Sequence, residues 1–145
     1  MDKIKKGANT VMFFSDNQHA IEIFSDLVKK RNPRNEFIIL EKVGDILGHL
    51  CNPLLPNPDI IIIDIQLENL MVLNLINQIK SSVHRYIPMI LIKRDNDEKN
   101  ILQFYSSYVN CFIMKPDESG KIVDILKSID EFWLGVVNLP KFQVI

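Results

Sequence analysis

The chain has 145 residues, of which 47% are hydrophobic and 24% charged, and its 17 basic and 18 acidic side chains leave a net charge of −1. This length and composition are typical of one soluble globular domain with its own core. The charge balance argues against nucleic-acid binding, which calls for a basic excess or stripe, and no apolar run approaches the roughly 20 residues that span a bilayer. We therefore expect a cytoplasmic protein with no nucleic-acid partner and no membrane partner.

Strands and helices alternate along the sequence. Short apolar runs bounded by turn residues predict five strands, at Val11–Phe14, Phe37–Leu40, Ile60–Asp64, Met89–Ile92 and Cys111–Met114. Apolar residues at helical spacing predict five helices, from about Ile21 to Asn32, over Val43–Leu50, Val72–Val83 and Leu102–Val109, and from Asp117 or Ser119 to Trp133.

This alternation predicts an α/β fold built from right-handed βαβ units, with a parallel sheet covered by helices on both faces. Five strands favour the flavodoxin-like, doubly wound order 2-1-3-4-5. In that order the first and third strands are neighbours at the point where the winding reverses, and such folds place their sites there.

Charged side chains end three of the predicted strands. Asp16 follows the first strand, Asp64 closes the third and Lys115 follows the fifth. Because parallel strands end at one edge of the sheet, we expect these side chains to meet there. Two carboxylates suit Mg²⁺, which uses one or two of them together with phosphate oxygens, and a carboxylate can attack phosphorus to form an acyl phosphate. The alternative is that Asp16 and Asp64 merely cap the helices that follow them.

These motifs resemble the receiver domains of two-component response regulators, and the resemblance covers nearly the whole chain. Ser15-Asp16-Asn17, Asp64 and Lys115-Pro116 carry it. Other features resemble the stand-alone receivers that partner bacterial phytochrome-type histidine kinases. They are the proline-bearing loop before the third strand, Asn110-Cys111-Phe112, and Glu131-Phe132-Trp133-Leu134 followed by Leu139-Pro140.

The resemblance implies a role for each matching residue. Asp64 is the expected phosphoacceptor, and Asp16, Asp64 and the backbone carbonyl of Gln66 are the expected Mg²⁺ ligands. Lys115 is expected to stabilise the phosphoryl group, and Phe112 falls at the aromatic switch position. The implied partner is a histidine kinase, and the domain is not expected to be an enzyme.

Three residues depart from the family's pattern. Ser15 replaces the first acidic residue, which lowers the ligand charge and should weaken Mg²⁺ binding. Lys93 stands at the switch position that normally carries a hydroxyl, and Arg94 replaces the small residue after it. The Lys93 ammonium could approach Asp64 and replace the metal, since opposite charges about 4 Å apart attract by roughly 4 kcal/mol at an effective dielectric of about 20. Alternatively, Lys93 and Arg94 extend into solvent and leave the site open.

Two functions are therefore open. The first is a single-domain response regulator whose Asp64 accepts a phosphoryl group from a histidine kinase in a two-component phosphorelay, which makes the chain a phosphoprotein. The second is a pseudo-receiver, a protein-interaction module that works without phosphorylation. A flavodoxin-type flavin binder is disfavoured because the carboxylate in Ser15-Asp16-Asn17 would repel a phosphate, and the scattered glycines argue against a nucleotide site.

We divide the chain into a short polar lead over residues 1–8, the receiver domain over 9–134 and a C-terminal tail over 135–145. Phe132 and Trp133, with the apolar residues that follow, leave more apolar surface than a five-stranded domain easily covers. Exposed aromatic residues of this kind are frequent interface anchors. We expect a homodimer through this segment, and the alternative is that the same residues pack into the core.

Overall fold

The computed structural model describes residues 7–40, 42–64, 69–93, 98–107, 109–114 and 119–141. Its strands are β1 (Thr10–Ser15), β2 (Glu36–Leu40), β3 (Ile60–Asp64), β4 (Met89–Lys93) and β5 (Cys111–Met114). Its helices are α1 (Gln18–Arg31), α2 (Asp45–Cys51), α3 (Asn69–Lys80), α4 (Glu98–Ser106) and α5 (Ser119–Ile129), and α5 continues into a π-helical turn over Asp130–Leu134. None of the described helices has the length and apolar character needed to cross a membrane.

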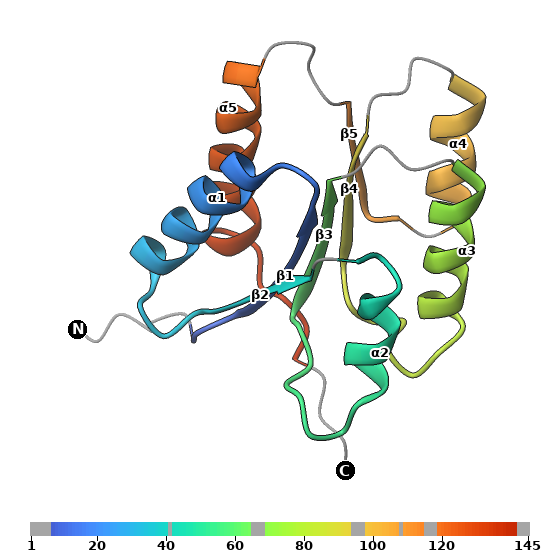
Figure 1. Cartoon of the computed structure of the whole chain (residues 1–145), viewed down its shortest axis with the longest axis horizontal. Helices are drawn as coiled ribbons and strands as arrows, with labels where there is room; N and C mark the ends of the chain where they lie inside the picture. The colour runs from blue at the N-terminus through green and yellow to red at the C-terminus, as the bar shows by residue number, and fades with distance from the viewer. Residues whose placement is uncertain are drawn as a thin grey trace.

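The strands form one parallel sheet in the order β2-β1-β3-β4-β5, which confirms the predicted fold. Helices α1 and α5 cover one face of the sheet, and α2, α3 and α4 cover the other (Figure 1). The register aligns Ser15 with Asp64 and Lys93 with Met114. The carboxyl ends of the strands therefore share one edge, at the top of Figure 1.

The isoleucine run of β3 explains why this strand lies at the centre of the sheet. Successive side chains of a strand point to opposite faces. Ile61 and Ile63 accordingly belong to the core cluster beneath α2, α3 and α4, whereas Ile60 and Ile62 belong to the cluster beneath α1 and α5. All four are at most 1% exposed. Burial on both faces is typical of strands in parallel sheets.

The structure corrects two predicted helix ends. Helix α3 ends at Lys80, and Val83 lies in a turn with 64% of its surface exposed. Ser82 supports this turn, because its hydroxyl donates to the Ile79 carbonyl at 2.6 Å and accepts the His84 N–H at 3.1 Å. Helix α4 ends at Ser106, before the buried Val109. An apolar period does not reveal where side-chain hydrogen bonds turn the backbone.

An ion pair joins α1 to the π-helical turn. The Arg31 Nε and Nη2 atoms each donate to the Asp130 carboxylate at 2.9 Å, and Asp130 is buried. The hydrogen bonds to Asp130, helped by its charge and opposed by burial, raise the pKa of Arg31 above its ordinary value. The pair therefore fixes the end of α5 against α1.

Replacing Asp130 should destabilise the fold. Asp130→Ala removes both acceptors of the Arg31 guanidinium, whose side chain is only 32% exposed. We expect the free energy of unfolding to fall by about 2 kcal/mol, less than for a fully buried pair because solvent reaches Arg31. Urea denaturation measures the loss. Asp124→Ala, at an exposed position of α5, is the matched control, and equal losses for the two variants would contradict the assignment.

The segment after the π-helical turn runs back to the amino end of β1. Leu139 is buried in the cluster beneath α1 and α5. The Lys141 ammonium donates to Asp59 Oδ2 at 2.7 Å and to Asn9 Oδ1 at 2.8 Å. The described part of the tail thus packs on the domain, while residues 1–6 and 142–145 lie outside the described ranges. The division at residues 8 and 134 stays a prediction.

Candidate phosphorylation site

Asp64 ends β3 at the carboxyl edge of the sheet and is fully buried. Its register partner on β1 is Ser15, which is also buried. The Ser15 hydroxyl donates a hydrogen bond to Asp64 Oδ2 at 2.8 Å. The candidate acceptor is therefore a carboxylate held by a hydroxyl from the neighbouring strand.

Asp16 is exposed at the same edge, directly after β1. The helix cap that follows is Asn17, whose side chain accepts the N–H groups of His19 at 3.0 Å and Ala20 at 3.2 Å. The alternative that Asp16 caps α1 is therefore wrong. Residues 65–68, between Asp64 and the described start of α3, lie outside the described ranges, so the alternative that Asp64 caps α3 stays a prediction.

Asp16 and Asp64 supply oxygen donors of the kind that Mg²⁺ prefers. This ion commonly uses one or two protein carboxylates and keeps several waters, so the residue types at this edge fit it. Within the described residues, no group of three or more His, Cys, Asp or Glu side chains is arranged to hold a metal. The third predicted ligand, Gln66, lies outside the described residues.

Lys115 and Arg94 also lie outside the described residues. Strand β5 ends at Met114, which is the register partner of Lys93 at the carboxyl end of β4. The chain therefore reaches the same edge as Asp64 at the residue before Lys115. The position of the Lys115 side chain stays a prediction.

Lys93 does not extend into solvent, because only 7% of its surface is exposed. Alternation along β4 places Lys93 on the face of Met89 and Leu91, which belong to the cluster beneath α2, α3 and α4. Asp64 alternates with Ile60 and Ile62 on the face beneath α1 and α5. The side chains of Lys93 and Asp64 thus leave the sheet on opposite faces, which argues against a direct replacement of the metal by Lys93.

Phe112 of β5 packs against α4. Its ring stacks on Phe104 with centroids 5.5 Å apart and an interplanar angle of 29°. Its backbone N–H donates to the Tyr105 hydroxyl at 3.1 Å. The sequence predicts Phe112 on the fifth strand but does not indicate Tyr105 as its hydrogen-bond partner. Helical spacing carries no information about a contact between a helix and an edge strand.

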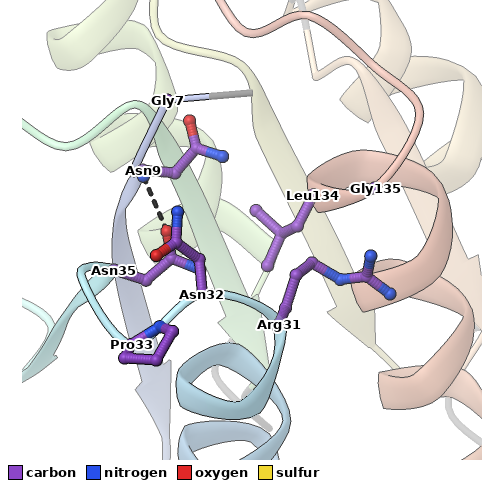
Figure 2. Close-up of a pocket in the computed structure, with 8 residues that line it drawn as sticks. All are labelled: Gly7, Asn9, Arg31, Asn32, Pro33, Asn35, Leu134 and Gly135. Carbon is purple, nitrogen blue, oxygen red and sulfur yellow. Dashed lines mark hydrogen bonds between the residues drawn. The ribbon is translucent and has the colours of Figure 1, made fainter. Parts of the chain in front are cut away.

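A cavity of about 380 Å³ lies at the opposite end of the sheet, where Asn9 precedes β1 (Figure 2). The Asn9 N–H donates to Asn35 Oδ1 at 2.7 Å, and Asn35 Nδ2 donates to the Val28 carbonyl at 2.9 Å. Figure 2 shows Arg31 directed away from these two asparagines. The sequence did not single out this cavity, and it is separate from the edge that carries Asp64.

No family model matches the chain. Response regulator Rcp1 of Synechocystis sp. is 26% identical over 86 residues, which are 59% of this chain and 58% of Rcp1. The probable methanogenesis regulatory protein FilR2 of Methanothrix harundinacea is 27% identical over 84 residues, 57% of this chain and 54% of that protein. The chain thus aligns with little more than half the length of these curated relatives.

Solved structures share the fold over nearly the whole chain. The Mn²⁺-bound form of response regulator Rcp1 has a TM-score of 0.81 and 21% identity, covering 92% of this chain and 99% of that one. The phosphorylated cyanobacterial phytochrome response regulator RcpA has a TM-score of 0.79 and 23% identity, covering 93% of this chain and 100% of that one. The chain is thus similar in sequence to curated response regulators, and it shares the fold of the receivers of phytochrome systems.

Proposed function

We propose that the chain acts as a single-domain response regulator that accepts a phosphoryl group on Asp64 from a histidine kinase. The observation that carries this proposal is the burial of Asp64 at the carboxyl end of β3, beside β1 and its exposed Asp16. In the transfer, an Asp64 carboxylate oxygen attacks phosphorus and forms the O–P bond of an acyl phosphate. The N–P bond of the kinase phosphohistidine breaks, and its electron pair stays on the imidazole nitrogen.

Asp16, Asp64 and the Gln66 carbonyl would hold the Mg²⁺ of this site. The bound ion supplies positive charge that neutralises the phosphoryl oxygens. Lys115 would add an ammonium for the same oxygens. Ser15 leaves one carboxylate fewer than the family's pattern, and we expect weak Mg²⁺ binding for this reason. The structure of the Mn²⁺-bound relative supports a divalent metal in this type of domain.

The output would pass through protein contacts on the face formed by β4, α4 and β5. Added negative charge at Asp64 would repack this face around Phe112. Phe112 packs on Phe104 and its backbone N–H donates to the Tyr105 hydroxyl, and we expect phosphorylation to change these contacts. We propose a cytoplasmic signalling role with no enzymatic turnover.

The intact mass after incubation with acetyl phosphate and Mg²⁺ tests this function. We expect the full chain to gain the mass of one phosphoryl group, because acetyl phosphate presents the same electrophile as the kinase. A standard receiver treated in parallel shows that the conditions suffice. If that receiver is modified and this chain is not, phosphorylation of Asp64 is rejected.

A pseudo-receiver is the second candidate, and the neutral Ser15 favours it. With Ser15 in place of an acid and Lys93 buried nearby in the sheet, the domain would hold one conformation without phosphate or metal. Calorimetric titration would then show no tight Mg²⁺ binding. Partner binding would also be the same for the wild type and for Asp64→Asn.

We further propose a homodimer through the end of α5 and the residues after it. Phe132 is 54% exposed and Val136 is 69% exposed. Trp133 is half-buried, contacts the Phe132 ring edge-on at 5.8 Å and packs on the core cluster beneath α1 and α5. Phe132 and Val136 thus provide the exposed apolar surface, and Trp133 packs between Phe132 and the core cluster.

Replacing both exposed side chains should separate the protomers. We expect the double variant Phe132→Ser, Val136→Ser to halve the mass measured by light scattering after size exclusion, because interface anchors carry most of the binding energy. Leu102→Ser, at an equally exposed position on α4, is the control. A dimer mass that survives the double variant rejects this interface.

A further inference from the structure

Ser15 makes two hydrogen bonds at the candidate site. Its hydroxyl donates to Asp64 Oδ2 at 2.8 Å and accepts the backbone N–H of Asn17 at 3.1 Å. Only 7% of Ser15 is exposed, so water competes little for either bond. One side chain therefore connects the end of β3 to the first residues after β1.

The second of these bonds shapes the turn that carries Asp16. A serine hydroxyl that accepts the N–H two residues later closes a local turn. Asp16 is the residue enclosed by this turn, and Asn17 then caps α1. The position of the Asp16 backbone thus depends on the Ser15 hydroxyl.

A carboxylate at position 15 could not replace this arrangement. An ionised carboxylate only accepts hydrogen bonds, whereas a hydroxyl both donates and accepts. A carboxylate would also place a second negative charge against the buried Asp64, and like charges in one site raise the cost of ionising both. Ser15 avoids this repulsion and still holds Asp64.

From this geometry we infer that Ser15 is a positioning residue for phosphoryl transfer to Asp64. Its hydroxyl fixes the Asp64 carboxylate and the Asp16 turn relative to each other, at the position where the family's pattern has an acidic residue. The inference rests on the proposed function, because it concerns the same acceptor. Ser15 then serves as a hydrogen-bonding link between the end of β3, which carries Asp64, and the turn after β1, which carries Asp16.

The first test needs no metal and no phosphate donor. In the metal-free protein, amide hydrogen exchange at Asn17 should be about tenfold faster in Ser15→Ala than in the wild type, since its acceptor is lost. Ser15→Thr keeps the hydroxyl and should restore the wild-type rate. Ser106→Ala, which removes an exposed hydroxyl on α4, is the control. Unchanged exchange at Asn17 in Ser15→Ala overturns the inference.

The second test measures Mg²⁺ affinity by calorimetry and the initial rate of phosphorylation by acetyl phosphate at saturating Mg²⁺. We expect Ser15→Ala to weaken Mg²⁺ binding and to slow phosphorylation about tenfold, because small displacements of reacting groups are costly. Ser15→Thr should stay within about threefold of the wild type on the same grounds. If Ser15→Ala does not fold, Ser15→Cys, whose thiol is a weak donor, takes its place with the same expected loss.

The outcomes separate the inference from the proposed function. A wild type that is never phosphorylated rejects the proposed function, and the Asn17 exchange still decides whether Ser15 shapes the turn. A wild type that is phosphorylated no faster than Ser15→Ala overturns the positioning role alone. Equal slowing in Ser15→Ala and Ser15→Thr also overturns it, because the hydroxyl would then not be the group that matters.

Discussion

Asp64→Asn is expected to abolish the phosphoryl adduct while leaving the fold intact. An asparagine has nearly the same shape as an aspartate, and its amide oxygen can accept the Ser15 hydroxyl as Asp64 Oδ2 does. It lacks the anionic oxygen that attacks phosphorus. The intact mass after incubation with acetyl phosphate and Mg²⁺ should therefore equal that of the untreated variant.

A matched control variant shows whether the missing adduct reflects the loss of Asp64 or a general loss of reactivity. Asp45→Asn removes an exposed carboxylate in the first turn of α2 and should gain the adduct as the wild type does. If Asp64→Asn is still modified, the acceptor is another carboxylate, and the buried position of Asp64 does not mark the reactive group.

Phe104→Ala should cost about 3–4 kcal/mol of unfolding free energy. Phe104 is fully buried in the cluster beneath α2, α3 and α4, and its ring stacks on Phe112. Its removal leaves a cavity and also frees one side of Phe112, the candidate switch residue. Urea denaturation followed by circular dichroism measures the loss.

An exposed aromatic residue provides the comparison. Phe132→Ala, at a site that is 54% exposed, should change the unfolding free energy of the monomer by no more than about 0.5 kcal/mol. A loss below about 1 kcal/mol for Phe104→Ala would show that α4 does not depend on this contact, since truncation of a buried phenylalanine normally costs far more.

The fold could be predicted because its information is local and repeated. The four consecutive isoleucines of β3 predict burial on both faces, and the alternation of strands with helices limits the topology to a parallel sheet. The end of α3 could not be predicted in the same way. The hydrogen bonds of Ser82 to Ile79 and His84 stabilise the turn that follows α3. The apolar helical spacing nevertheless continues through this turn to Val83.

The candidate site could be predicted in part. Asp16 and Asp64 follow from strand ends, because topology brings β1 and β3 together. The role of Ser15 could not be predicted, since only the register and rotamer show that its hydroxyl reaches Asp64. The face of the sheet on which Lys93 lies could have been predicted from the sequence. Lys93 alternates with Leu91 and Met89 along β4, so these three residues lie on one face of the sheet. Asp64 alternates with Ile60 and Ile62 along β3 and lies on the other face.

Localising the modified residue after transfer from a phosphorylated histidine kinase shows whether Asp64 is the phosphoacceptor. We expect borohydride reduction of the acyl phosphate, followed by peptide mass spectrometry, to find the modification on Asp64 and on no other carboxylate. Transfer to a different residue, or no transfer from a kinase that phosphorylates a standard receiver in parallel, would contradict it.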